Sequence, residues 1–489
     1  MMVNKILKNV LSAGCAVCMT LSLIAGTVAG TGRVMQADAA DNSTVTLRVC
    51  NWEEYIDESM VDEFEEWYEQ AYGSKVNVLY STIGTNEELY NMLTLGDEYD
   101  LVCPSEYMIM KLMAEGWLEP YSDEFHNASG RYNYYAKGVS PFISEIFDNN
   151  KINGESWSRY AAGYMWGITG IVYNPEYVSE EEASTWTIIN NPKFKRQITI
   201  KDNVRDSMFA AVGAVKADIL TDKAFINSSD YSKNLAQEMN DTSEETVEKV
   251  LEYLQKAKDN VYSFETDSAK ADMVTQKVKA SYQWSGDAVY TMDQAEEDDV
   301  ELAFAVPEES TNLYFDGWVM LKSGISGNSE KKQAAEAFVN FLSMPENAVR
   351  NMDYIGYTSV ISGGDSDVVY DYVRECYEAD DDDTDKVEYP LGYFFSGDSS
   401  DERYMLTTSS EQTKRQLSAQ YPLETTMERS AVMQYFDNDA NTQINQMWIN
   451  VRCYNISNMP MAVRILIGIA ITLIVGGYIY KKIRGHIEK

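Results

Sequence analysis

The chain has 489 residues, of which 45% are hydrophobic and 24% are charged, as in a folded protein of two or three domains rather than a disordered one. Its formal net charge of −37 argues against a nucleic-acid partner, because phosphates require clustered Lys and Arg. This charge would favour cationic small ligands by steering, although much of it is explained equally well by solvated acidic side chains that keep a secreted protein soluble.

The first 39 residues have the pattern of a secretory signal peptide. Lys5 and Lys8 precede an apolar segment over 10–29, and the small residues Ala37 and Ala39 suit signal peptidase. We therefore predict a signal peptide over 1–39 and an extracytoplasmic location for the domain that follows.

Strands and helices then alternate. The hydrophobic patterns predict a strand over 45–50, a helix over 60–72, a strand over 75–82, a helix from Thr85 or Asn86 and a strand over 99–103. This order favours a parallel sheet, and ligands of such sheets bind at the carboxyl ends of the strands.

A second block repeats the alternation over 163–352. It includes an amphipathic helix that a capping box of Thr242 and Glu245 is predicted to open. The pattern weakens over 363–429, where the acidic run Asp380–Asp385 predicts a solvated loop, with a metal site as the alternative. A helix returns over 431–453. No linker separates the blocks, so we expect the chain to cross between two lobes more than once.

A second apolar stretch covers residues 459–480 and contains one charged residue, Arg464. Such a helix, at 1.5 Å per residue, crosses a bilayer core of roughly 30 Å. The basic residues that follow it are typical of a cytoplasmic flank. We therefore predict a transmembrane helix over 459–480, a cytoplasmic tail over 481–489 and a single-pass location in the cell membrane with the main domain extracellular.

Four of the six cysteines remain after the signal peptide, which is too few for a disulfide scaffold. Cys50 and Cys103 each end a predicted strand, and those strands are candidates for neighbours. A disulfide between them and two buried thiols are the alternatives.

The sequence lacks the common catalytic signatures. His126 is the one histidine between the signal peptide and the second apolar stretch, and no P-loop, G-x-S-x-G or H-E-x-x-H motif occurs. A carboxylate pair of the glycosidase type could arise by chance among 77 acids. We therefore predict a binding protein that is not an enzyme and has no cofactor or metal.

Aromatic and acidic residues gather at the predicted strand ends. Aromatic faces attract ammonium ions by about 0.5–2 kcal/mol each, and carboxylates bind them with about 1.5–3 kcal/mol per charged hydrogen bond. A flexible organic cation therefore fits this group, which consists of Trp52, Glu53, Glu54, Tyr55, Ser105, Tyr107, Asp206, Trp284, Tyr314, Asp316 and Tyr357.

Several of these residues stand in motifs that resemble a known family. "LRVCNWEEYI", "YDLVCPSEYM", "DNVRDSMF", "YQWSGDA", "YFDGWVMLKSG" and "DYIGYTS" match, in order, the spermidine/putrescine-binding proteins of polyamine ABC transporters. The resemblance implies a two-lobed periplasmic-binding-protein-like α/β fold (type II) in which helices flank a mixed sheet in each lobe. It assigns 45–157 and 315–366 to lobe 1, and 158–314 and 367–457 to lobe 2.

The resemblance also implies that a polyamine is captured between the lobes and delivered to ABC permease subunits. Asp316 and Asp206 would anchor the two ammonium ends, and aromatic residues would wall the methylene chain. The ligand residues that it implies are Trp52, Glu53, Glu54, Tyr55, Ser105, Tyr107, Asn203, Asp206, Trp284, Tyr314, Asp316, Tyr357 and Gln434.

Three positions depart from the family pattern. Glu53 stands where Thr or Ser is usual, Asn203 where Asp is usual and Tyr314 where Trp is usual in spermidine binders. These changes leave open which polyamine binds. The alternatives are another solute on the same fold, such as ferric ion or a sugar, and a carboxylate-pair glycosidase.

Overall fold

The computed structural model describes residues 44–380 and 383–453. The predicted signal peptide over 1–39, transmembrane helix over 459–480 and tail over 481–489 lie outside these residues, as do two aspartates of the acidic run. Within the described ranges no helix is both long and apolar enough to cross a bilayer. The fold class of the described residues is therefore corrected to the two-lobed α/β fold alone, and the predicted membrane helix is no part of it.

The centre of the described chain is one mixed sheet, ordered β2-β1-β3-β12-β7-β10-β8-β9, with four short strands paired beside this path. Its longest members, β7 and β12, are antiparallel and buried along their whole length. The strands are β1 Thr44–Trp52, β2 Lys75–Ile83, β3 Leu101–Val102, β4 Leu118–Glu119, β7 Ala161–Tyr173, β8 Ile198–Lys201, β9 Ser263–Glu265, β10 Ala280–Trp284, β11 Ala303–Ala305, β12 Thr311–Leu321, β13 Thr358–Ser359 and β16 Ser430–Ala431.

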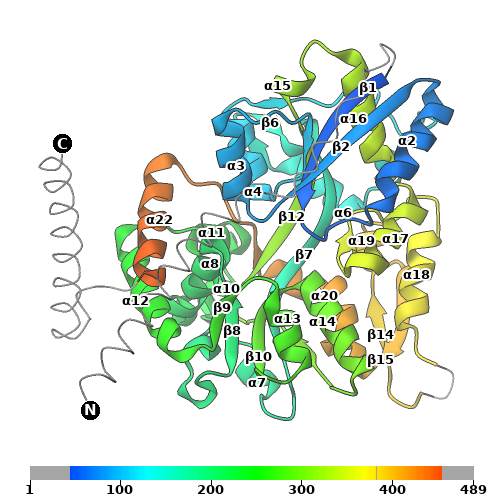
Figure 1. The fold of residues 1–489 in the computed structure, drawn as a ribbon. Coiled ribbons are helices and arrows are strands. Elements are labelled where there is room, and N and C mark those ends of the chain that lie inside the picture. The colour runs from blue at the N-terminus through cyan, green and yellow to red at the C-terminus, as the bar shows by residue number, and fades with distance from the viewer. Residues whose placement is uncertain (1–43, 381–382, 454–489) are drawn as a thin grey trace, which may run out of the picture. The chain divides into compact units, whose positions relative to one another are not determined.

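The sheet has two halves that run in opposite directions. β1 and β3 are parallel to each other and antiparallel to β12, whereas β8, β9 and β10 are parallel to one another and antiparallel to β7. The carboxyl ends of the two sets therefore face each other near the middle of β7 and β12, where Ser105 bridges to Asp316 and Trp284 pairs with Thr169. Figure 1 shows β7 and β12 passing between the two halves, as expected for a chain that crosses between lobes.

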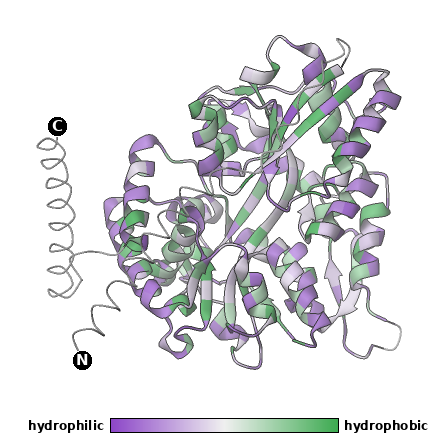
Figure 2. Cartoon of the chain, viewed as in Figure 1, coloured by the Kyte–Doolittle hydropathy of each residue, from purple (hydrophilic) through white to green (hydrophobic). Residues whose placement is uncertain are grey.

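Amphipathic helices cover the sheet, and Figure 2 shows hydrophilic and hydrophobic residues on the same helices. The helices before β10 are α2 Ser59–Tyr72, α3 Asn86–Leu95, α4 Glu106–Ala114, α5 Tyr134–Gly138, α6 Pro141–Asn149, α7 Glu180–Ala183, α8 Val204–Val215, α9 Ala217–Leu220, α10 Lys223–Ile226, α11 Tyr231–Met239, α12 Glu244–Asn260 and α13 Ser268–Val274. Those after it are α14 Ser285–Glu297, α15 Lys322–Ile325, α16 Ser329–Leu342, α17 Pro345–Ile355, α18 Val368–Tyr377, α19 Gly392–Phe395, α20 Gln416–Gln420, α21 Glu424–Glu428 and α22 Asn438–Arg452.

Local capping explains several helix boundaries. Thr85 caps α3 through a hydrogen bond from the Glu88 amide, and Gly73 ends α2 in the left-handed conformation, both as predicted. The predicted capping box at α12 is wrong, because the Ser243 hydroxyl, not Thr242, accepts the Thr246 amide. Adjacent Ser and Thr residues compete for the same cap, and the sequence alone does not separate them.

The two strand-end cysteines are neighbours, as expected. β1 and β3 pair with Cys50 opposite Val102, and the Cys103 amide donates to the Cys50 carbonyl at 3.0 Å. Both side chains are buried free thiols, so the structure has the second of the two alternatives.

The weakly patterned segment over 363–429 is ordered into several short elements. Besides α18 to α21, it contains a hairpin of β14 (Lys386–Pro390) and β15 (Met405–Ser409). Another small hairpin, β5 (Lys151–Ile152) with β6 (Glu155–Ser156), lies outside the main sheet. Stacked and edge-on aromatic rings join α18, α19 and Tyr404, the residue before β15. These ring contacts explain how the segment folds although its sequence has no clear hydrophobic period.

Candidate functional site

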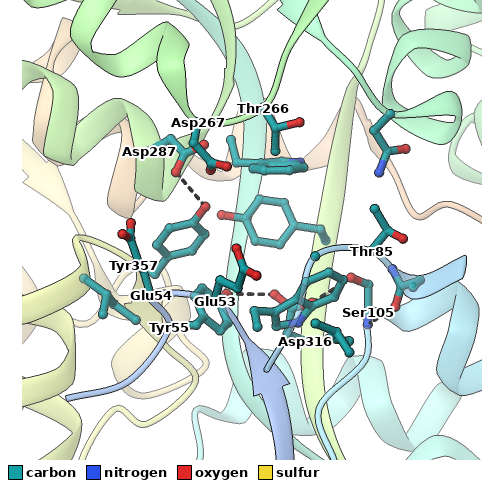
Figure 3. A pocket seen from close by; sticks show the side chains of 18 of the residues that line it. Glu53, Glu54, Tyr55, Thr85, Ser105, Thr266, Asp267, Asp287, Asp316 and Tyr357 are labelled. Carbon is teal, nitrogen blue, oxygen red and sulfur yellow. Dashed lines mark hydrogen bonds between the residues drawn. The ribbon is translucent and has the colours of Figure 1, made fainter. Parts of the chain in front are cut away.

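A cavity of about 890 Å³ lies where the carboxyl ends of the two half-sheets meet. Its walls come from the loops after β1, β2, β3, β8 and β9, from the starts of α8 and α14, and from the middle of β12. Figure 3 shows Tyr357 and Asp287 on one side of this cavity and Asp316 and Ser105 on another. This is the position at which open α/β sheets bind ligands.

Asp316 is the buried acid at one side of the cavity. It is 7% exposed and accepts hydrogen bonds from the Tyr55 and Ser105 hydroxyls, each at 2.7 Å. The register of β12 shifts between Asp316 and Gly317, and such bulges re-aim side chains beside binding sites. Burial raises the pKa of Asp316 to about 6, although both hydroxyl donors lower it. Among the described residues no Lys or Arg forms an ion pair with it.

Three tyrosines form an aromatic wall beside Asp316. The Tyr55 and Tyr357 rings meet edge to face with centroids 4.7 Å apart, and Tyr357 and Tyr314 lie 6.4 Å apart. All three hydroxyls already have hydrogen-bond partners: Tyr55 donates to Asp316, Tyr357 donates to Asp287 at 3.0 Å, and the Tyr314 and Ser285 hydroxyls bond to each other at 3.3 Å. The wall therefore presents ring faces and edges more than free hydroxyl groups.

Asp206 is a second buried acid, at the start of α8. Its side chain accepts from the Trp284 indole at 3.3 Å. Burial raises the pKa of Asp206 to about 6, against a lowering effect of Lys201. The neighbouring Asn203 is the N-cap of α8, and its side-chain oxygen accepts the Arg205 and Asp206 amides. That oxygen therefore caps the helix, a role that Asn and Asp fill equally well.

Asp287 is the third buried acid, and it differs from the other two. Lys201 lies 2.9 Å and Lys270 lies 3.6 Å from its carboxylate oxygens. Burial raises the pKa of Asp287, but the two lysines outweigh it and hold the pKa below its usual value. The Lys201 ammonium also lies 3.4 Å from the centre of the Trp284 ring. Asp287 is therefore already neutralised from within the protein.

Arg205 forms a cationic contact between the two halves of the site. Its guanidinium lies 4.3 Å from the Tyr107 ring centre and 4.0 Å from that of Phe436. It also donates to the Gln434 carbonyl at 2.5 Å. The Tyr107 hydroxyl donates to Glu87 at 3.2 Å. Tyr107 thus joins α4 to α8 through its ring.

Acidic side chains dominate the cavity. The basic residues that line it are Arg205 and Lys270. The acidic ones are Glu53, Glu54, Asp57, Glu58, Glu106, Asp202, Asp206, Asp267, Asp287 and Asp316. The field of such a cavity attracts cations and repels anions.

The structure brings together all but one of the ligand residues predicted from the sequence. Gln434 does not line the cavity. Its backbone carbonyl accepts from Arg205, and its backbone N–H donates to the side-chain oxygen of Asn240. Glu53 and Glu54 line it as exposed side chains. The residues that line it are Trp52, Glu53, Glu54, Tyr55, Ser105, Tyr107, Asn203, Asp206, Trp284, Tyr314, Asp316 and Tyr357.

Sequence reasoning missed several residues of the cavity. Glu106 is 1% exposed, and burial raises its pKa to about 8, so it is protonated at neutral pH. Asn312 is buried and its side-chain oxygen has no partner among the described residues, which leaves an acceptor for a ligand. Asn312 shares its strand face with Tyr314 and Asp316, and Asp287 follows Trp284 by three residues, so these two positions could have been found from spacing.

Residues 59–370 match the model of the family described as bacterial extracellular solute-binding protein. The chain belongs to this family. The prediction of a solute-binding protein rather than an enzyme is thereby confirmed, and so is an extracellular or periplasmic location of the solute-binding domain.

Curated relatives of the chain carry polyamine names. The chain is 24% identical over 327 residues to the spermidine/putrescine-binding periplasmic protein of Salmonella typhimurium, covering 66% of this chain and 78% of the relative. It is 22% identical over 345 residues to the putrescine-binding periplasmic protein PotF of Escherichia coli, covering 69% and 83%. The resemblance seen in the sequence motifs is confirmed by these matches.

Solved structures share the fold. The spermidine/putrescine ABC transporter substrate-binding protein PotD of Streptococcus pneumoniae superposes with a TM-score of 0.53 at 22% identity, covering 83% of this chain and 98% of that one. The TpPotD lipoprotein of Treponema pallidum gives 0.57 at 18% identity, covering 83% and 99%. The two-lobed α/β fold expected for the described residues is therefore confirmed.

Proposed function

We propose that this chain captures a polyamine in the cavity between its two half-sheets and delivers it to the permease of an ABC transporter. The observation that carries the proposal is Asp316, a buried carboxylate that accepts two hydroxyl groups and has no cationic partner among the described residues. A buried charge of this kind is costly unless it is paired, and a ligand ammonium group would pair it.

The remaining cavity suits the rest of such a ligand. Asp206 provides a second buried carboxylate, and Tyr55, Trp284 and Tyr314 provide aromatic surface for methylene groups between the charges. Two charged bonds of about 1.5–3 kcal/mol each and three aromatic contacts of about 0.5–2 kcal/mol each span the roughly 8 kcal/mol of a micromolar complex before ordering costs are subtracted. The polyamine names of the relatives support the same ligand class.

The alternative solutes fit the cavity less well. Ferric ion would require free tyrosine and carboxylate oxygens, but Tyr55 and Tyr357 already donate their hydroxyl hydrogens to carboxylates. A neutral sugar would leave Asp316 and Asp206 without a positive charge to pair with. The chemistry of the cavity therefore favours an organic cation.

A thermal-shift panel on the purified full chain tests this proposal. Putrescine, cadaverine, spermidine and spermine are compared with amino acids, sugars and ferric citrate. A ligand at 100 times its Kd should stabilise the protein by about 2.7 kcal/mol, which raises Tm by several degrees. A shift with a sugar or with iron and none with any polyamine would reject the proposal.

A further inference from the structure

The three buried aspartates of the cavity are not equivalent. Asp287 is bound by the Lys201 ammonium at 2.9 Å, by the Lys270 ammonium at 3.6 Å and by the Tyr357 hydroxyl at 3.0 Å. Its side chain is 6% exposed, so these partners have displaced most of its water. Asp287 therefore has the contacts that a ligand ammonium group would otherwise supply.

Asp316 and Asp206 form no such ion pair among the described residues, although Lys201 and Arg205 are near enough to Asp206 to lower its pKa. Their hydrogen-bond donors are neutral hydroxyl and indole groups from Tyr55, Ser105 and Trp284. No Lys or Arg in the described ranges lies within ion-pair distance of either carboxylate. Two buried negative charges are thus left for the ligand.

We propose that Lys270, supported by Lys201, serves as a built-in ammonium group at Asp287, so that the cavity selects a diamine over a triamine. This inference rests on the proposed function, and it specifies that the ligand has two ammonium groups. The two free carboxylates match two ammonium groups. Asp287 is the remaining buried aspartate of the cavity, and a third ammonium group that paired with it would have to displace Lys270 or lie beside it, where like charges repel.

Lys270 is the residue that makes the selection, because it lines the cavity and Lys201 does not. Lys201 is buried against Trp284, with its ammonium group over the Trp284 ring and its side chain 2% exposed. The Lys270 side chain is 22% exposed, so it can be replaced without opening the core. A neutral residue at position 270 would leave the buried Lys201 on Asp287 but would remove the ammonium group that faces the cavity.

Calorimetry on the full chain at pH 7.5 tests the inference with putrescine and spermidine as probes. Wild type should bind putrescine at least tenfold more tightly than spermidine. Lys270→Met should reduce this ratio at least tenfold by raising the affinity for spermidine, whereas Lys270→Arg should keep it. Lys277→Met is the matched control, because Lys277 pairs with Asp272 outside the cavity and should leave the ratio unchanged.

Lys270→Gln repeats the loss of charge with a different side chain, so the test stands if the Met variant unfolds. A ratio in both neutral variants within twofold of wild type would overturn the inference, as would a wild-type preference for spermidine. Wild-type protein that binds both amines equally would reject only the diamine selection. Wild-type protein that binds neither would reject the proposed function and the inference with it.

Discussion

At the scale of single residues, Asp316 shows how the site is prepared for its ligand. Its carboxylate is buried between two hydroxyl donors, and burial raises its pKa to about 6 from an ordinary value of 3.8. Because the folded-state pKa is raised, the ionised form costs folding stability above pH 6, and this cost is absent below about pH 4. The ligand-free protein therefore carries a penalty that a bound ammonium group would relieve.

Asp316→Asn separates binding from stability. Losing one charged bond should weaken putrescine binding by about 1.5–3 kcal/mol, measured by calorimetry. The same change removes an unpaired buried charge, so the Tm of the ligand-free variant should match or exceed that of wild type at pH 7.5. Asp272→Asn, at an ion pair outside the cavity, is the control for binding. Unchanged putrescine affinity in Asp316→Asn would show that Asp316 does not contact the ligand.

The pH dependence of binding follows from the same groups. The pKa values of Asp316 and Asp206 are both raised to about 6, so both carboxylates become protonated as the pH falls through 6. A neutral carboxyl group does not pair with an ammonium ion, so affinity should fall by about tenfold per carboxyl group between pH 7 and pH 5. Calorimetry from pH 5 to pH 8 measures this. A flat profile would contradict the role of both aspartates.

At the scale of elements, the sequence predicted which residues follow the strands and reach the site. It did not predict which side chains pair with one another there. The alternation of β1, α2, β2 and α3 is local and readable, and the acids and aromatics that follow those strands reach the cavity. The ion pairs at Asp287 join β8, α13 and α14, which no local spacing brings together. Gln434 was predicted to contact the ligand but lies outside the cavity for the same reason. Its position depends on how the long segment over 363–429 folds, and no local pattern shows this.

Gly286 shows how closely α14 packs against Tyr357, just after α17, at the site. A Cβ atom at this position in α14 would lie 2.3 Å from the Tyr357 ring, which holds Asp287. Gly286→Ala should therefore destabilise the protein by about 1–3 kcal/mol, despite the better helix propensity of Ala, and should weaken putrescine binding. Thermal unfolding and calorimetry measure the two effects.

Gly84→Ala is the matched control for that variant. Gly84 also lines the cavity, but a Cβ there would meet only one side-chain oxygen at 3.5 Å, an ordinary contact. It should change stability and affinity little. Equal effects of the two substitutions would argue against a specific role of the contact between α14 and Tyr357.

At the scale of the whole molecule, the fold places two oppositely directed half-sheets against one acidic cavity. β7 and β12 join the halves as continuous buried strands. The strand ends from both halves supply the acids and aromatic rings, so neither half forms the site alone. The formal net charge of the chain, −37, has the same sign as the charge of the cavity and favours the approach of cations.

Calorimetric titration of the purified full chain with putrescine at pH 7.5 tests the central claim most directly. We expect saturable binding of one putrescine per chain with a Kd in the micromolar range or below, roughly 8 kcal/mol of binding free energy. A titration that shows no saturable heat with putrescine, cadaverine, spermidine or spermine, on protein that unfolds cooperatively, would contradict the account.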